Sequence, residues 1–232
     1  MSFGVSLRVR GEYACFTRPE MKVERVSYDI ITPSAARGIL EAVYWKPSIR
    51  WVIDRIHVIN PIKFTNIRRN EVGGKLSEAS IKKSMRDMKT PVSFFIEEDR
   101  QQRAALVLKD VEYIIEAHFE FTSKEDNDPD KHTAMFSERA SKGRCFNTPY
   151  LGCREFSASF ELIEGEIPVS KIQGETDLGW MLHDINYQPA DSKNKNSFLT
   201  GQGKRVVAEP QFFRAVMKNG IVEVPALSST GA

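Results

Sequence analysis

The stretch from Val111 to Phe121 reads VEYIIEAHFEF, and its alternation decides the fold. Two sets of residues alternate with a period of two, which indicates a β-strand with one buried and one open face. The buried set is Val111, Tyr113, Ile115, Ala117, Phe119 and Phe121. The open set is Glu112, Ile114, Glu116, His118 and Glu120. The sequence therefore predicts a half-buried strand whose open face is acidic and carries one histidine.

Further strands and helices are predicted on both sides of this strand. They are a strand over 3–10, a helix from Thr32 until Pro47, a strand from Trp51 to Ile59, a helix from His132 to Ala140 and a strand from Phe156 to Leu162. The resulting order is β-α-β-β-α-β. This order predicts an α+β fold of the ferredoxin-like kind, which is also the topology of RNA-recognition domains.

The first helix and the second strand have clear local signals. Thr32 is a good N-cap and Pro33 suits the first helical position. The buried face of this helix is predicted to be Ala36, Ile39, Leu40 and Val43. In the strand from Trp51 to Ile59, the predicted buried residues are Val52, Ile56 and Val58, and the predicted open residues are Arg55 and His57.

The chain is predicted to form two domains. Residues 1–162 would be the ferredoxin-like domain, with an insertion at about 63–108. The insertion has a helix-prone stretch from Ser77 to Lys89 and predicted short strands around Val92 to Ile96. Residues 163–232 would be a small antiparallel β-sheet domain, because Asn219-Gly220 between two strand-like runs is a strong hairpin signal.

Composition excludes several classes of protein. Lys and Arg number 33 against 31 Asp and Glu, so a net charge of +2 does not by itself indicate a polyanion partner. The three cysteines, Cys15, Cys145 and Cys153, suggest no disulfide framework. The four histidines are scattered, so no metal site and no cofactor is expected. We expect a soluble cytoplasmic protein, because neither a signal peptide nor an apolar run of membrane length is present.

Basic residues are nevertheless clustered. The segments 131–155 and 191–218 combine Lys and Arg with phenylalanine and tyrosine, the mixture that tracks a nucleic-acid backbone and stacks its bases. Solvated basic loops are the alternative interpretation. On the open sheet face, Arg8 and Arg10 are expected beside the glutamates of the central strand. Two interpretations of this face are open. It is either a solvated set of cross-strand ion pairs or a functional site in which a buried or clustered charge shifts the pKa of His118.

Five motifs, in order along the chain, resemble one known family. They are Thr32 to Pro47 (TPSAARGILEAVYWKP), Lys109 to Phe119, Lys142 to Phe156, Asp177 to Leu182 and Phe213 to Gly220. Together they are similar to the CRISPR-associated RAMP proteins of subtype I-C, the Dvulg group. The resemblance covers almost the whole chain, and it implies the same two-domain fold.

The resemblance also implies an activity. Members are metal-independent endoribonucleases that cut precursor CRISPR RNA within the repeat. The ribose 2′-hydroxyl attacks the adjacent phosphate and leaves a 2′,3′-cyclic phosphate. The protein then stays on the 5′ handle as a subunit of the type I-C DNA-targeting complex in antiviral defence. The alternative is a non-catalytic subunit that binds the RNA handle as a scaffold.

The resemblance assigns residues to these roles. Tyr44 corresponds to the proposed base and His118 to a histidine on the third strand. Relatives carry a lysine beside this histidine, whereas this chain has Glu116 and Ala117 there. This departure favours the scaffold, unless another cation replaces the lysine. The candidate RNA-binding residues are Arg8, Arg10, Lys46, Lys142, Arg144, Arg154, Lys204 and Arg205. For Tyr44, the alternative role is an aromatic plug at the end of its helix.

Overall fold

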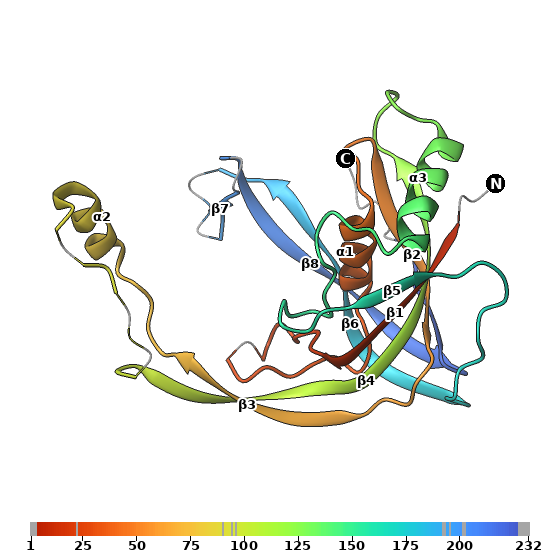
Figure 1. Ribbon diagram of the computed structural model, residues 1–232, viewed down its shortest axis with the longest axis horizontal. Coiled ribbons are helices and arrows are strands. Elements are labelled where there is room, and N and C mark those ends of the chain that lie inside the picture. The colour runs from red at the N-terminus through yellow and green to blue at the C-terminus, as the bar shows by residue number, and fades with distance from the viewer. Residues whose placement is uncertain are drawn as a thin grey trace.

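The computed structural model describes residues 4–21, 23–89, 91–93, 95, 97–191, 194, 196–200 and 203–226. Within these residues the protein is a mixed α/β structure, with one large antiparallel sheet and three helices (Figure 1). The strands are β1 (Val5–Ala14), β2 (Ile49–Val58), β3 (Phe64–Val72), β4 (Arg100–Phe121), β5 (Ser159–Leu162), β6 (Glu175–Pro189), β7 (Phe198–Leu199), β8 (Arg205–Lys218) and β9 (Ile221–Glu223). The helices are α1 (Pro33–Val43), α2 (Glu78–Asp87) and α3 (Pro129–Ser141). None of these helices is long and apolar enough to cross a membrane.

The strand order is β5-β1-β4-β2-β9-β8-β6, with β3 paired to β4 and β7 to β8. The predicted central strand is confirmed as the second half of β4, which pairs with β1 on one side and β2 on the other. The predicted first strand is confirmed from Val5 onward, and Phe3 lies outside the described residues. The predicted helices are also confirmed: α1 ends at Val43, before the expected Pro47, and α3 is a few residues longer than expected.

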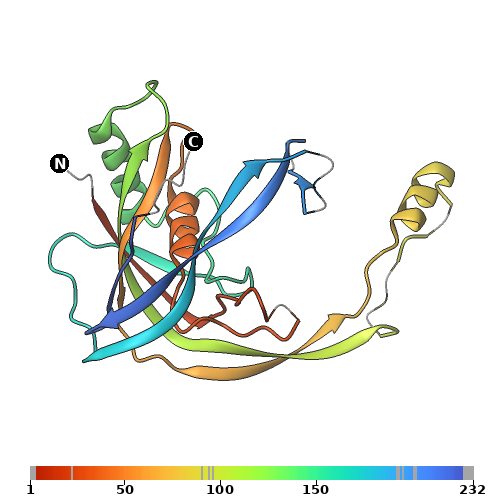
Figure 2. The same cartoon turned by 180° about the vertical axis from the view of Figure 1, so that it is seen from behind.

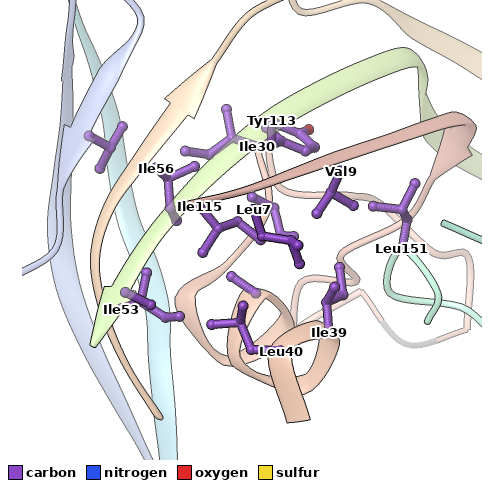
Figure 3. Packing of buried hydrophobic residues seen from close by; sticks show 14 of the residues in the cluster. Leu7, Val9, Ile30, Ile39, Leu40, Ile53, Ile56, Tyr113, Ile115 and Leu151 are labelled. Carbon is purple, nitrogen blue, oxygen red and sulfur yellow. The ribbon is translucent and has the colours of Figure 1, made fainter. Parts of the chain in front are cut away.

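The hydrophobic core lies between the sheet and helices α1 and α3. Side chains of β1, β4 and α1, including Leu7, Ile115 and Leu40, interdigitate there, as Figure 3 shows. The predicted buried face of α1 is confirmed in full. Burying about 25 cal/mol per Å² of apolar surface makes this packing the main force that holds α1 on the sheet.

A β-bulge in β2 corrects one part of the predicted pattern. The register between β2 and β4 shifts between Ile53 and Arg55, so Asp54 is an extra residue. Before the bulge, Ile53 faces the core and Val52 lies opposite His118 on the other face. The prediction that Val52 shares a face with Ile56 and Val58 was therefore wrong, because a bulge reverses the alternation. Arg55 and His57 lie on the open face, as predicted.

The predicted insertion at 63–108 is a long β-hairpin arm. Strand β3 pairs with the first part of β4 from Phe64–Leu108 to Val72–Arg100, and α2 lies at its far end. The predicted helix is confirmed. Of the residues around Val92 to Ile96 for which short strands were predicted, 92, 93 and 95 are outside any strand, and 94 and 96 lie outside the described residues. The arm and the end of the β6–β8 hairpin project to the same side of the body, left in Figure 1 and right in Figure 2.

The C-terminal strands continue the sheet of the N-terminal ones. The predicted hairpin at Asn219-Gly220 is confirmed between β8 and β9, with both residues at positive φ. Strand β9 then pairs with β2, and Arg55 lies opposite Glu223. The strands on both sides of residue 162 thus belong to one sheet, and the predicted division into two domains stays a prediction.

Candidate nucleic-acid interface

The position of Tyr44 follows from how α1 ends. The Thr32 hydroxyl accepts a hydrogen bond from the Ala35 amide at the start of the helix. At the other end Tyr44 is extended, with φ −151° and ψ 122°, and its amide donates to the Leu40 carbonyl. This turn directs the Tyr44 ring into the core, where the residue is only 1% exposed, and leaves Trp45 and Lys46 at the surface.

Tyr44 is hydrogen-bonded to a buried histidine. Its hydroxyl lies 2.8 Å from Nδ1 of His132, a fully buried residue of α3. On the other side of the ring, His132 Nε2 lies 2.7 Å from the Asp126 carbonyl oxygen. A carbonyl oxygen can only accept, so Nε2 carries the hydrogen. In the neutral imidazole, Nδ1 is then an acceptor, and the Tyr44 hydroxyl donates to it.

The surroundings of Tyr44 keep its hydroxyl protonated. Burial raises the pKa of Tyr44 above its usual value of 10.0, and the charge of Asp126 acts in the same direction, against Lys131 and Arg139. The Arg139 guanidinium lies over the Tyr44 ring, 5.4 Å from its centroid, and donates to the Val43 carbonyl at the end of α1. At neutral pH the Tyr44 hydroxyl is therefore a hydrogen-bond donor. It can act as a base only if it passes its own proton to another group.

His118 lies on the opposite face of the sheet from Tyr44. Phe119, the next residue of β4, packs against Trp51 and His132 on the helix-covered face, so His118 points away from it. There His118 Nδ1 is 2.8 Å from a carboxylate oxygen of Asp54, the bulge residue of β2. The structure thus does not bring the two predicted catalytic residues together.

The rest of the open face consists mainly of ion pairs, and Ile114, predicted to be open, is fully buried among them. Arg8 Nε lies 3.2 Å from Glu112, and Arg10 lies 3.6 Å from Glu161. Glu116 is 2.6 Å from His57 Nε2 and 3.5 Å from Arg55. The carboxylates therefore engage both predicted RNA-binding arginines, Arg8 and Arg10, and this face fits the interpretation of cross-strand ion pairs.

The loop after α3 forms one wall of a groove beside α1. Phe146 and Asn147 both donate their amides to the Ala42 carbonyl, at 2.8 and 3.3 Å, which fixes the loop to the last turn of α1. Further on, Leu151 is buried, and its carbonyl accepts from the Cys15 amide at 3.0 Å. Between these two anchors the aromatic side chains stay exposed, and Phe146 is 82% exposed.

The groove has a volume of about 1260 Å³ and lies along the outer side of α1. Its charged lining residues are Glu41, Lys46, Arg139 and Arg154, and its exposed aromatic residues are Trp45, Phe146 and Tyr150. Lys46 and Arg154 form no ion pair within the part of the chain that the structure describes. The groove thus joins cations that can contact phosphates to rings on which bases can stack.

The remaining predicted RNA-binding residues lie outside this groove. Lys142 and Arg144 both pair with Glu138, at 2.6 and 3.5 Å. Lys204 is exposed near the end of the β6–β8 hairpin, and the Arg205 guanidinium donates to the Ser197 hydroxyl at 3.1 Å. Within the predicted basic segment 191–218, the lysines at 193 and 195 and residues 201–202 lie outside the described residues.

Comparison with known proteins gives the family. The model of the family Cas_Cas5d, described as CRISPR-associated protein (Cas_Cas5), matches residues 4–225. The chain belongs to the Cas5d family of CRISPR-associated proteins. It is 50% identical to the "CRISPR pre-crRNA endoribonuclease Cas5d" of Mannheimia succiniciproducens, over 97% of this chain and 96% of that protein. It is 41% identical to the protein of the same name from Thermus thermophilus, over 96% and 91% of the two chains.

Solved structures agree with this membership. One entitled "Crystal Structure of CRISPR-associated Protein" is 26% identical and superposes with a TM-score of 0.65, covering 97% of this chain and 93% of the other. This Cas5d-family chain therefore shares its fold with that CRISPR-associated protein over nearly the full length of both chains. In its described residues, no group of three or more His, Cys, Asp and Glu side chains is placed to hold a metal ion.

Sequence reasoning missed three residues of this Cas5d-family site: His132, Arg139 and Glu41. Arg139 was counted only among the basic residues of the segment 131–155, and His132 only as the start of a predicted helix. The available signal for His132 was its place four residues after the N-cap Asp128, which puts it in the first turn of α3. Nothing in the sequence indicated that its ring meets Tyr44, because that contact joins residues 88 positions apart.

Proposed function

We propose that the protein binds precursor CRISPR RNA and cuts it within the repeat. The observation that carries this proposal is family membership over residues 4–225, with near-full-length relatives at 50% and 41% identity that are named pre-crRNA endoribonucleases. The reaction is attack by a ribose 2′-hydroxyl on the adjacent phosphate, which yields a 2′,3′-cyclic phosphate and a 5′-hydroxyl and needs no metal ion.

The groove along α1 supports this substrate. Three of its four charged lining residues are cations, and Lys46 and Arg154 are left to contact phosphates. Trp45 and Tyr150 are 53% and 42% exposed and offer platforms for unpaired bases. We propose Lys142, Arg144, Lys204 and Arg205 as outer contacts to the repeat hairpin and handle.

Tyr44 is our candidate for the group at the 2′-hydroxyl. As its oxygen takes the proton from the 2′-hydroxyl, its own proton passes to His132 Nδ1, so no free phenolate is needed. His132 becomes an imidazolium, with the Asp126 carboxylate 3.7 Å from Nε2. Tyr44 is buried, so RNA binding has to displace part of its cover, which includes Arg139.

His118 is proposed as a phosphate ligand or as the proton donor to the leaving 5′-oxygen. Asp54 accepts from its Nδ1, so Nε2 is the nitrogen available to RNA, and Nε2 donates to a phosphate only in the imidazolium form. The attacking 2′-oxygen and the leaving 5′-oxygen are bonded to the same phosphorus, so while Tyr44 acts, a His118 on the opposite face serves only as a ligand of another phosphate. This role requires that RNA contacts the open face as well as the groove. Arg8 and Arg10 would assist there only by exchanging their carboxylate partners for phosphate.

The experiment is cleavage of the protein's own repeat RNA in excess EDTA. We expect a single cut that survives the chelator and leaves a 2′,3′-cyclic phosphate, and we expect Tyr44→Phe to lose it. Tyr113→Phe is the matched control, since it also removes a buried hydroxyl, but one that bonds the Ile31 backbone and not His132. Full cleavage by Tyr44→Phe would remove Tyr44 from the mechanism, and RNA that is neither bound nor cut would refute the proposed function.

The second candidate function is a non-catalytic subunit that binds the RNA handle. Glu116, at the family's lysine position, favours it, because a carboxylate held by His57 and Arg55 cannot stabilise a phosphorane. In the same assay this function predicts tight binding with the RNA left intact.

The architecture and partners complete the proposal. We propose a ferredoxin-like unit within residues 1–162, supported by the order β5-β1-β4-β2, and a small β-rich unit over 163–232. We also propose that the protein works in the cytoplasm as a type I-C complex subunit in antiviral defence. In support, α2 has no buried residue, and Ile81 and Met85 of α2 are exposed together with Met88 just after it.

A further inference from the structure

One carboxylate stands among the cations of the RNA groove. Glu41 lies on the last turns of α1 and lines the groove with Lys46, Arg139 and Arg154. A carboxylate repels phosphates, so it does not help to hold an RNA backbone. Its position in the groove therefore needs another explanation.

Glu41 is not needed to neutralise a neighbouring cation. Its nearest partner is the Arg37 guanidinium, with Nε 3.5 Å from Oε1. Both terminal nitrogens of Arg37 already donate to the Asp184 carboxylate of β6, one of them at 2.9 Å. One guanidinium thus faces two carboxylates, and the cluster keeps a surplus negative charge.

The Glu41 carboxylate, which carries this surplus charge, is partly buried. Burial raises the pKa of Glu41, and Asp184 acts in the same direction, against Arg37. A half-buried carboxylate without hydrogen-bond donors is costly, and its two oxygens accept up to four hydrogen bonds. In the described residues no hydrogen bond to either Glu41 oxygen is formed, so their acceptor capacity faces the groove.

The surroundings of Glu41 fit a flat ring with donors on its edge. Beside Glu41 the groove is lined by three small residues of α1, Ala35, Gly38 and Ala42, so few side-chain atoms protrude from the helix there. A Cβ added at Gly38 would meet no heavy atom within 4 Å. Trp45 and Phe146 are exposed beside this surface as stacking platforms. Unpaired RNA bases are read in this way, by stacking and by hydrogen bonds to their Watson–Crick edge.

We propose that Glu41 reads an unpaired guanine of the bound RNA, accepting hydrogen bonds from N1–H and the N2 amino group. Guanine is the common base that presents two adjacent donors on this edge, which match the two oxygens of a carboxylate. Glu41 is then a specificity residue of the groove, and this inference rests on the proposed RNA-binding function.

The test is a binding cycle with Glu41→Gln and RNA in which each guanosine is replaced, one at a time, by inosine, which lacks the N2 amino group. At one position we expect inosine to weaken wild-type binding by about fivefold to tenfold, the loss of part of a bidentate base contact. Glu41→Gln, which keeps only one acceptor oxygen, should bind both RNAs equally. Glu120→Gln removes the same charge from the open face and should leave the inosine effect intact.

The alternatives give different results. If Glu41 were only a repulsive charge, Glu41→Gln would tighten binding to every RNA and leave the inosine effects unchanged, which overturns the proposal. An inosine scan without effect on the wild-type protein also overturns it, while RNA binding itself stands. A wild-type protein that fails to bind repeat RNA at all would instead refute the proposed function.

Discussion

Replacing Gly152 by alanine tests how the groove wall is built. Gly152 has φ +83°, and a Cβ placed on it would lie 2.0 Å from the Cys15 carbonyl oxygen and 2.6 Å from the Cys15 carbonyl carbon. Both atoms belong to the backbone of the β1 end, which cannot rotate away. The loop has to move instead, and the hydrogen bond from the Cys15 amide to Leu151 is lost.

The size of the effect follows from three contributions. A left-handed conformation costs an alanine about 1 to 2 kcal/mol relative to glycine. The lost backbone hydrogen bond adds about 1 kcal/mol. Displacing the buried Leu151 side chain from its packing adds about 1 kcal/mol or more. We therefore expect Gly152→Ala to lower the free energy of unfolding by about 3 to 4 kcal/mol, and to weaken RNA binding because Tyr150 and Arg154 move with the loop.

Gly143→Ala is the matched control in the same loop. Gly143 has φ +63°, but a Cβ there meets no atom within 4 Å. It should therefore cost only the backbone contribution, about 1 to 2 kcal/mol, with RNA affinity nearly unchanged. Urea unfolding and fluorescence anisotropy with labelled repeat RNA measure both quantities. Equal losses in the two variants would show that contact with Cys15 does not position the loop.

Three further predictions concern the groove and its floor. Tyr44→Phe leaves the buried His132 Nδ1 without its donor, and should lower the free energy of unfolding by about 1 to 3 kcal/mol in urea titrations; an unchanged stability would mean that the hydroxyl is not bonded there. The fold raises the pKa of Glu41 above 4.5, so this residue's contribution to stability is present below pH 4.5 and lost as the pH rises through the folded-state pKa. Glu41→Gln, which never ionises, should thus gain stability over the wild type at pH 7 and show no gain at pH 4, and unfolding curves with no pH-dependent difference would contradict this. Arg154→Ala should weaken RNA binding at low salt and reduce the slope of log K against log salt by about one, whereas an unchanged slope would mean that Arg154 contacts no phosphate.

Local patterns predicted the elements whose signals lie within a few residues. Helix α1 followed from Thr32-Pro33 and an apolar stripe, and the core half of β4 followed from an alternation that only Ile114 breaks. The β8–β9 hairpin followed from Asn219-Gly220, two residues that adopt positive φ. In each case the residues that give the sequence signal are the same residues that form the helix start, the buried strand face or the turn.

Features that depend on distant pairing could not be predicted in this way. The bulge at Asp54 leaves the composition of β2 unchanged but reverses the face on which Val52 lies. The continuation of β4 into the arm depends on pairing with β3. The joining of the N-terminal and C-terminal strands into one sheet depends on the pairing of β9 with β2. The candidate site met the same limit, because His132 reaches Tyr44 only once α3 packs on the sheet.

The pairing of β2 with β9 has a consequence for synthesis. Arg55 and Glu223, which meet in this pair, are 168 residues apart in sequence. At roughly 5 to 20 residues per second, a ribosome takes on the order of 10 to 30 s to make the chain between them. During that interval the outer edge of β2 has no partner and could join a strand of another nascent chain. The bulge that Asp54 makes in the pairing with β4 bends β2, and Arg55 adds a charge to the strand. Irregular, charged edges resist such pairing. We expect the same irregularity that reversed a predicted face to help protect the growing protein from aggregation until its own late strand arrives.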